Sequence, residues 1–293
     1  MLLLLLACAP DGPALDGTLT GAPAELLIAH LEGGEVLRFG VDGTPLDPVV
    51  SGDAVEAIEA YTDRAFAPSA VVPLDDGGAW ISDFVTGAVV SVDADGAFSG
   101  VVREAGSGDG RLQEPCVMVR HGSRVAVLGN DSGNVVFVDG SNTEAVLGVP
   151  VPLRRPHGLE LLGDEAWIGR SATEPGAGQV QRFDLVTGEP LGEFAPWPLV
   201  EEATAVRLDG DRLLVADFFL GRITAWDPWS GAFLGEVAVG LDGPIDVEVD
   251  AGGVLWVLDR EGVVRIDPRG DAERVLSGAD LGPGWTRDLV LVP

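Results

Sequence analysis

The sequence predicts an all-β protein, and more narrowly a six-bladed β-propeller closed by its C-terminal strand. Three observations lead to this prediction. Short apolar runs alternate with turns rich in Gly, Pro and Asp along most of the chain. A similar set of runs returns every 40 to 53 residues, which is the spacing of propeller blades. A further apolar run stands at the C-terminus, where it is available to complete the first repeat.

The repeat is most regular over Asp211–Gly240. This segment contains three predicted strands, and a fourth stands just before it: Leu213–Ala216, Arg222–Trp226, Phe233–Val237 and Thr204–Leu208. Four short antiparallel strands cannot bury both faces of their own sheet. The unit therefore has to stack on copies of itself, as the blades of a propeller do.

The end of the second strand marks each copy of the repeat. Six such ends occur along the chain, at His30, Asp83, Asn130, Arg170, Asp217 and Asp259. The same second strand carries a Trp in three copies, at Trp80, Trp167 and Trp256. We interpret these indoles as core between neighbouring blades and not as a cage for a ligand.

The first repeat, which begins at Ala24, has no inner strand before its second strand, and the chain ends with a spare one. We therefore expect Arg287–Val292 to pair beside Ala24–Ala29 as the inner strand of the first blade. A ring closed in this way leaves no exposed inner edge.

The chain is strongly acidic, because 47 Asp and Glu residues stand against 18 basic residues and give a formal net charge of −29. This excess argues against nucleic acid as a partner and against electrostatic binding to anionic lipid. An acidic excess of this size would attract cations or suit a medium of high salt concentration. Membrane attachment is expected only through a lipid at the N-terminus.

The N-terminal run ends in Leu5-Leu6-Ala7-Cys8, which resembles the lipobox of bacterial lipoproteins. The resemblance implies a signal segment over residues 1–8, lipid attachment at Cys8, and a location in the bacterial cell envelope, at the outer membrane or facing the periplasm. Residues 9–22 are small, polar and turn-rich, as expected of a flexible tether, and residues 23–293 then form the propeller. The alternative is an ordinary apolar N-terminus with a chance Cys. Cys116, at the start of an apolar run, is interpreted as a small buried hydrophobe.

Individual motifs resemble those of the NHL-repeat, YVTN and gluconolactonase-like propeller superfamily. They are Pro156-His157-Gly158-Leu159 at the start of an inner strand, Val215-Ala216-Asp217 at the end of a second strand, and the whole repeat Gly243–Gly270. The resemblance covers about residues 24–293 and implies the fold. Such motifs specify function poorly.

Candidate functional residues gather where inner strands start and second strands end, because these points share one mouth of the channel. The inner ring is Ser69, Cys116, His157, Thr204, Asp246 and Asp288, and the outer ring consists of the six marker residues. From these we select His157, Asp246, Asp288, Arg170, Asp83, Asp217 and Asp259 as candidates that face a ligand. The structural alternatives are that each marker Asp caps its turn, that Arg170 pairs with an Asp of a neighbouring blade, and that His157 is a hydrogen-bonded turn residue.

Gluconolactonase-like enzymes hold a divalent metal with a Glu, Asn residues and an Asp. The resemblance makes Asp246 the best metal-ligand candidate, for a divalent cation such as Ca²⁺. Ser69 stands where those enzymes have the Glu, and His157-Gly158 stands where they have Asn-Gly. Virginiamycin B lyase-like proteins, which have seven blades, share a similar Pro-His-Gly start.

We therefore expect a non-catalytic binding or interaction module, with no catalytic residues assigned and no cofactor required. Its partner would be a protein, a glycan or a small molecule at the mouth where the inner strands start. The alternative function is a metal-dependent lactonase-like hydrolase or lyase that uses the same mouth.

Overall fold

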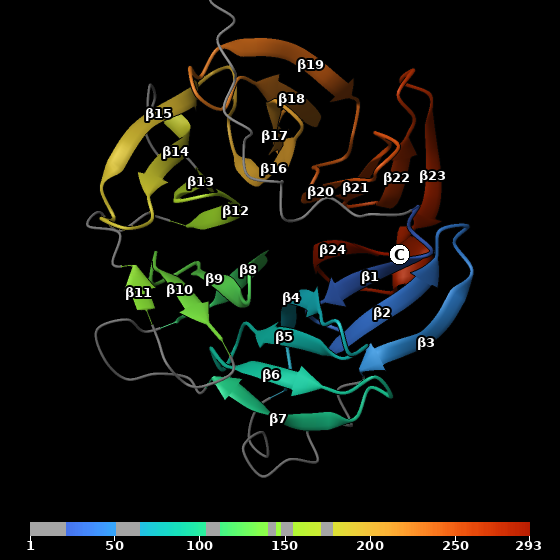
Figure 1. The fold of residues 1–293 in the computed structure, drawn as a ribbon. Coiled ribbons are helices and arrows are strands. Elements are labelled where there is room, and N and C mark those ends of the chain that lie inside the picture. The colour runs from blue at the N-terminus through green and yellow to red at the C-terminus, as the bar shows by residue number, and fades with distance from the viewer. Residues whose placement is uncertain (1–21, 51–64, 104–111, 140–144, 148–154, 171–177) are drawn as a thin grey trace, which may run out of the picture.

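The computed structural model describes residues 22–50, 65–103, 112–139, 145–147, 155–170 and 178–293. Six four-stranded antiparallel sheets are arranged in a ring around a central channel (Figure 1), so the predicted six-bladed β-propeller is confirmed. The proposed signal segment with Cys8, and residues 9–21 of the proposed tether, lie outside the described part of the chain. In the part that is described, no helix is both long and apolar enough to cross a bilayer.

Each blade runs from an innermost strand at the channel to an outermost strand at the rim. In this order, blade 1 is β24 (Thr286–Val292), β1 (Glu25–His30), β2 (Glu35–Gly40) and β3 (Pro45–Val50). Blade 2 is β4 (Pro68–Pro73), β5 (Ala79–Asp83), β6 (Val89–Val92) and β7 (Phe98–Arg103). Blade 3 is β8 (Pro115–His121), β9 (Arg124–Gly129), β10 (Val135–Val138) and β11 (Ala145–Leu147).

The second half of the ring repeats the pattern. Blade 4 is β12 (Pro156–Leu162), β13 (Glu165–Arg170), β14 (Gly178–Asp184) and β15 (Pro190–Pro196). Blade 5 is β16 (Ala203–Asp209), β17 (Arg212–Asp217), β18 (Arg222–Trp226) and β19 (Phe233–Val239). Blade 6 is β20 (Asp246–Val249), β21 (Leu255–Asp259), β22 (Gly262–Ile266) and β23 (Ala272–Ser277), followed by the short helix α2 (Gly278–Leu281).

Ring closure follows the sequence-based prediction. Strand β24 pairs antiparallel with β1, with Val292 opposite Glu25 and Asp288 opposite Ala29. The last strand of the chain therefore forms the inner edge of the first blade. The N-terminal strand is held between β24 and β2, so the two ends of the propeller secure each other.

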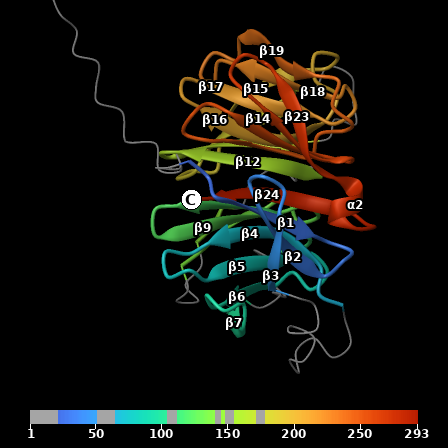
Figure 2. The same ribbon diagram turned by 90° about the vertical axis from the view of Figure 1, so that its right-hand side faces the viewer.

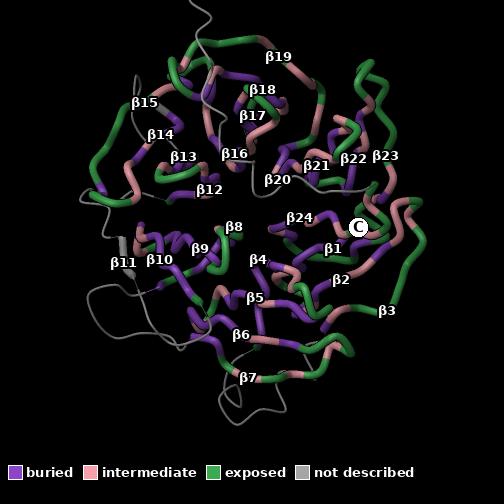
Figure 3. The backbone as a smooth tube through the Cα atoms, viewed as in Figure 1, coloured by how far each residue is buried: buried purple, intermediate pink, exposed green. Residues whose placement is uncertain are grey.

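The core lies between the blades, because each blade packs both of its faces against neighbours. In β17, Leu213 and Val215 face blade 4, whereas Leu214 and Ala216 face blade 6. Successive side chains of a strand point to opposite faces, so a strand buried on both faces reads as a continuous apolar run. Figure 3 shows that buried residues are concentrated in the inner and middle strands, whereas exposed residues gather along outermost strands such as β19 and β23. The three second-strand Trp residues were expected to pack between neighbouring blades. Their burial agrees with this, since Trp167 and Trp256 are buried and Trp80 is half-buried.

The propeller has two distinct mouths. We call the end where the inner strands begin the strand-start face, and the end where they finish the strand-end face. In Figure 2, α2 lies at the strand-start face and the C-terminus at the strand-end face. This distinction matters because the two faces carry different chemistry.

Candidate functional site

Residues at the second position of the inner strands link the blades to one another. A hydroxyl or thiol at this position donates to the carbonyl of a Pro at the start of the next blade's inner strand, or just before it, in three blades: Ser69 to Pro115, Cys116 to Pro156 and Thr204 to Pro244. The Thr204 bond is 2.7 Å long and the Cys116 contact is 3.3 Å. Burial raises the pKa of the Cys116 thiol to about 12, so it stays protonated and able to donate. These side chains hold the ring together.

His157 occupies the same position in blade 4 and contacts both neighbouring blades. Its Nδ1 lies 3.3 Å from Nδ2 of Asn130, and its Nε2 lies 3.4 Å from Oε1 of Glu202. Burial lowers the pKa of His157 to about 4, helped by the nearby positive charges of Arg287 and Arg155. The imidazole is therefore neutral at pH 7 and held between two polar partners. Gly158 follows it because a Cβ there would come within 2.9 Å of the Ala205 Cα on the next blade.

The three marker carboxylates bind the turns that follow them and the segments that precede the inner strands. Asp83 accepts hydrogen bonds from the backbone amides of Val85 and Ala67 and from the Thr86 hydroxyl. Burial raises the pKa of Asp83, and the bond from Thr86 partly offsets that rise. This is the turn-capping arrangement that the sequence offered as the structural alternative.

Asp217 and Asp259 have comparable surroundings. Asp217 accepts from the amides of Glu201, Glu202 and Leu220, and burial raises its pKa while these bonds oppose the rise. Asp259 binds both terminal nitrogens of Arg274, at 2.8 and 2.9 Å. Each carboxylate is thus engaged within its own region of the fold.

The Arg170 guanidinium lies 3.1 Å from the Glu193 carboxylate. The strands that carry these residues, β13 and β15, belong to the same blade. This ion pair therefore lies within blade 4, and the pairing of Arg170 with an Asp of a neighbouring blade stays a prediction.

Asp246 and Asp288 do not belong to the ring that contains His157. In the strand register Asp246 lies opposite Leu258 and Asp288 opposite Ala29, positions that correspond to Gly158 opposite Gly169 in blade 4. The single inner ring predicted from the sequence is therefore wrong for these two residues. Both lie one position further along the channel.

At that position each Asp links its blade to the next. One carboxylate oxygen of Asp246 accepts a hydrogen bond from the Leu289 backbone amide, at 3.0 Å. The other oxygen accepts a hydrogen bond from the backbone amide of the next residue, Val247. Asp288 accepts the Val71 amide at 2.8 Å. Removing the Asp246 carboxylate leaves a buried amide without this partner, so we expect Asp246→Ala to lower the stability of the fold.

Deeper in the channel, one guanidinium lies among acids from neighbouring blades. Arg207 of β16 is paired with Glu248 of β20, and its Nη1 lies 3.6 Å from the Glu160 carboxylate of β12. Glu160 also accepts the Leu208 amide at 3.0 Å. Blades 4, 5 and 6 thus contribute one charged side chain each at the same position of their inner strands.

The electrostatic balance of this cluster is acidic. Burial raises the pKa of Glu248 to about 8, although the positive charge of Arg207 opposes the rise. Burial and the negative charge of Asp246 raise the pKa of Asp288 well above its ordinary value, and burial raises that of Asp246. Burial acts to lower the pKa of Arg207, but the charges of Glu248 and Glu160 outweigh it and raise that pKa. One guanidinium does not compensate the four carboxyl groups, so protons are retained on some of them.

A cavity of about 440 Å³ opens onto this cluster from the strand-end face. Its walls include the apolar residues Val119, Leu161 and Val249, and its charged lining consists of Asp75, Arg120, Glu160, Arg207, Asp209, Glu248, Asp250 and Asp288. Of the seven candidates selected from the sequence, only Asp288 lines it. The cavity is large enough for a small molecule and combines apolar walls with a few convergent charges.

Sequence reasoning missed Glu160, Arg207 and Glu248. The signal was present, since each is a charged residue with an apolar residue on either side, within the inner strands of three consecutive repeats. A charge in such a position has to be compensated by a neighbour or by a bound partner.

The described residues do not fit a divalent-metal site. No three His, Cys, Asp or Glu side chains among them are grouped so that they could hold an ion. Asp246, the best candidate ligand from the sequence, directs its two oxygens at two backbone amides. We derive no chemistry through a metal at this position.

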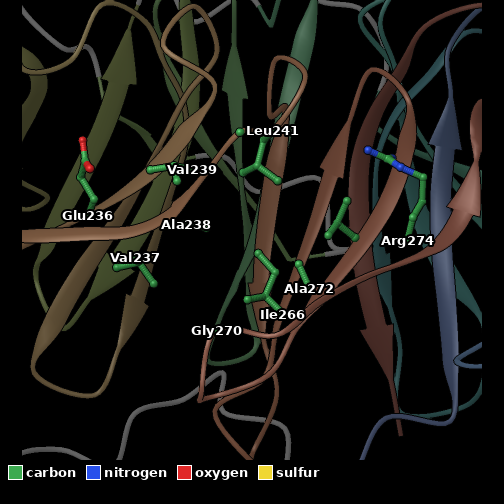
Figure 4. Close-up of a pocket in the computed structure, with 11 residues that line it drawn as sticks. Glu236, Val237, Ala238, Val239, Leu241, Ile266, Gly270, Ala272 and Arg274 are labelled. Atoms are coloured by element: carbon green, nitrogen blue, oxygen red, sulfur yellow. The ribbon is translucent and has the colours of Figure 1, made fainter.

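A second cavity, of about 480 Å³, lies between blades 5 and 6 near the rim (Figure 4). It separates β19 from β22 and β23, and Leu241, Ile266 and Ala272 contribute apolar surface. Its two charged lining residues have partners, because Glu236 pairs with Arg222 and Arg274 pairs with Asp259. This groove therefore offers a ligand less uncompensated charge than the channel cavity does.

Solved structures share the fold at low sequence identity. A chain from a nidogen/laminin complex superposes with a TM-score of 0.69 and 12% identity, over 90% of this chain and 97% of that chain. A streptogramin B lyase gives a TM-score of 0.55 at 15% identity, over 70% and 67%. Virginiamycin B lyase from Staphylococcus aureus gives 0.53 at 16% identity, over 70% and 68%.

No protein-family model matches the sequence, and no curated protein matches it. Identities this low show the fold alone, and these structures include both a protein complex and lyases. They share the β-propeller fold with this chain, in agreement with the arrangement of its six sheets. Fold likeness does not decide between binding and catalysis, which have to be argued from the site.

Proposed function

We propose that this propeller is a non-catalytic binding module that takes a small organic cation into the strand-end mouth of its channel. The observation that carries the proposal is the cavity of about 440 Å³ that opens onto Arg207, Glu160, Glu248 and Asp288. The described lining contains six carboxyl groups and two guanidiniums, an acidic excess that matches the net charge of −29. A cationic guest supplies the positive charge that the channel lacks.

The guest is organic because the cavity has apolar walls as well as carboxylates. An ammonium group on a short alkyl chain would place its charge near Glu248 and Asp288 and its carbon atoms against Val119, Leu161 and Val249. The described lining contains no Ser, Thr, Cys or His, so its polar groups are carboxyl groups, guanidiniums and backbone atoms.

Calorimetric titration with hexylammonium tests the proposal, with hexanoate as the anion of matched length. We expect hexylammonium to bind in 0.15 M salt, more tightly at pH 8.5 than at pH 6.5, because it displaces protons from the cluster. Glu248→Gln should weaken this binding by about tenfold, equivalent to ~1.4 kcal/mol. Glu273→Gln is the matched control, because Glu273 lies on the outer strand β23 with a largely exposed side chain. Equal binding of hexanoate, or no effect of Glu248→Gln, would refute the cation site.

The second candidate function is the lactonase-like hydrolase or lyase at the strand-start mouth. One observation favours it: the His157 imidazole lies at this mouth, 3.3 Å from Asn130 and 3.4 Å from Glu202, two polar side chains that would orient it. Hydrolysis of a simple lactone that depends on added divalent metal and is lost in His157→Ala would establish this function. We expect no such hydrolysis.

We also propose that a lipid attached to Cys8 anchors the protein in the bacterial cell envelope. Its support is the resemblance of Leu5–Cys8 to a lipobox. A protein, glycan or small-molecule partner at the strand-start face is also part of the proposed binding role, and the exposed apolar side chains of that face favour a protein.

A further inference from the structure

Two segments at the strand-start end of blade 5 expose large apolar side chains. The connection from β15 to β16 carries Trp197 and Leu199, which are 45% and 43% exposed. The turn between β17 and β18 carries Phe219 and Leu220, which are 66% and 38% exposed. We call these four residues the blade-5 apolar surface. Contiguous apolar residues exposed on a monomer commonly mark an interaction site.

The two segments are joined by hydrogen bonds and so form one surface. Arg222 donates to the Leu199 carbonyl at 2.6 Å, and the Phe218 amide donates to the Glu202 carbonyl at 3.1 Å. Asp217 accepts amides from both segments, those of Glu201 and Leu220 among them. The buried carboxylate therefore holds the surface in place before any partner arrives, which lowers the entropy cost of binding.

The charges around this surface are mostly negative. Glu201 and Glu202 contribute carboxylates beside the surface, whereas the Arg222 guanidinium is already paired with the Glu236 carboxylate. His157, which contacts Glu202, is neutral at pH 7. With a net charge of −29 on the whole chain, a second copy of this protein or another acidic protein is repelled from this face. A basic partner is attracted to it.

From this combination we propose that the blade-5 apolar surface is a docking site for a protein segment that carries both Arg or Lys and large apolar side chains. The apolar residues of that segment would cover Phe219 and Trp197, and its basic residues would face the surrounding carboxylates. Trp and other aromatic residues are enriched among side chains that dominate binding energy. The surface lies at the opposite end of the propeller from the cation cavity, so this site does not depend on that cavity.

A synthetic peptide of Leu, Trp and Arg is the probe, and fluorescence anisotropy is the measurement. Two twin peptides isolate its chemistry: in one each Arg is replaced by Glu, and in the other each Leu and Trp is replaced by Ser. We expect the basic apolar peptide to bind with an affinity that falls as salt rises, and neither twin to bind measurably. Saturating hexylammonium should not displace it, because the two sites are separate.

Phe219→Ser and Trp197→Ser should each weaken binding of the basic apolar peptide by about tenfold, equivalent to ~1.4 kcal/mol. Val186→Ser is the matched control, because Val186 is 74% exposed and lies in the turn after β14. Both test side chains are exposed, so these variants should fold and should keep hexylammonium binding. That retained binding separates failure of this site from failure of the cation site.

Three outcomes would overturn the proposal. The first is that the basic apolar peptide fails to bind or binds equally to the parent and to Phe219→Ser. The second is that the acidic twin binds as well as the basic peptide. The third is that sedimentation shows a dimer of the parent that Phe219→Ser abolishes, which would assign the surface to a second copy of the chain.

Discussion

The Asp288 carboxylate accepts a hydrogen bond from the Val71 backbone amide at 2.8 Å, although the two residues are 217 positions apart in the chain. Asp288 lies on β24, the last strand, and Val71 lies on β4, the first inner strand along the sequence. Asp246 makes the equivalent bond to Leu289 one blade earlier. Carboxylates of the inner strands thus join consecutive blades across the point where the ring closes.

Asp288→Ala should reduce the free energy of unfolding by about 1–3 kcal/mol, because it leaves the buried Val71 amide without its acceptor. Asp288→Asn should keep most of the stability, since its side-chain carbonyl accepts the same bond and adds no charge. Urea unfolding at pH 7 measures both variants. Asp271→Ala is the control at an exposed Asp. Equal stability of the Ala and Asn variants would contradict the role assigned to this bond.

Deletion of residues 285–293 should remove β24 and expose the inner edge of β1. An unpaired edge of this kind recruits strands from other molecules. We expect the truncated protein to aggregate on expression or at lower temperature than the full chain, as measured by light scattering during heating. A truncated protein that matched the full chain in solubility and heat resistance would show that closure by β24 is dispensable.

Stability should fall as the pH rises from 6.5 to 8.5. The pKa of Glu248 is about 8 in the folded protein against 4.5 as the reference, so between these values the folded state retains a proton that the unfolded chain has lost. Raising the pH therefore favours unfolding, and this contribution is lost progressively through pH 8. His157 acts in the opposite direction but only below pH 6.5, since its pKa is lowered to about 4.

Urea midpoints at pH 6.5, 7.5 and 8.5 measure this slope, and Glu248→Gln should flatten it. The Gln cannot ionise and so removes one proton-linked group from the channel. Glu273→Gln, at an exposed position, should leave the slope unchanged. A slope that is identical in the parent and in Glu248→Gln would mean that Glu248 does not titrate in this range.

Cys8→Ser should release the protein from the membrane fraction when the gene is expressed in a bacterium with a complete upstream signal. The reason is that a lipid can no longer be attached, and no helix in the described residues is suited to span the bilayer. Immunoblots of membrane and soluble fractions measure the distribution. Unchanged membrane association of Cys8→Ser would place the anchor elsewhere.

The sequence by itself determined the architecture, because each repeat reports its own strands locally. Continuous apolar runs such as Leu213–Ala216 are typical of strands buried on both faces, and the spacing of their ends predicted six copies. The spare run Arg287–Val292 predicted closure onto the first blade, which the pairing of β24 with β1 confirms. These inferences need only local periodicity and the rule that exposed strand edges are covered.

Only the tertiary structure decided which charged residues meet. In the sequence, His157 and Asp246 both stand where inner strands begin, but their positions in the strand register differ by one residue. Asp246 therefore accepts the Leu289 amide, whereas His157 lies between Asn130 and Glu202. Arg207, Glu160 and Glu248 lie in separate repeats, and the sequence does not state that their side chains converge on one cavity. Register and ring geometry decide such contacts, because a shift of one residue along a strand turns a side chain to another face.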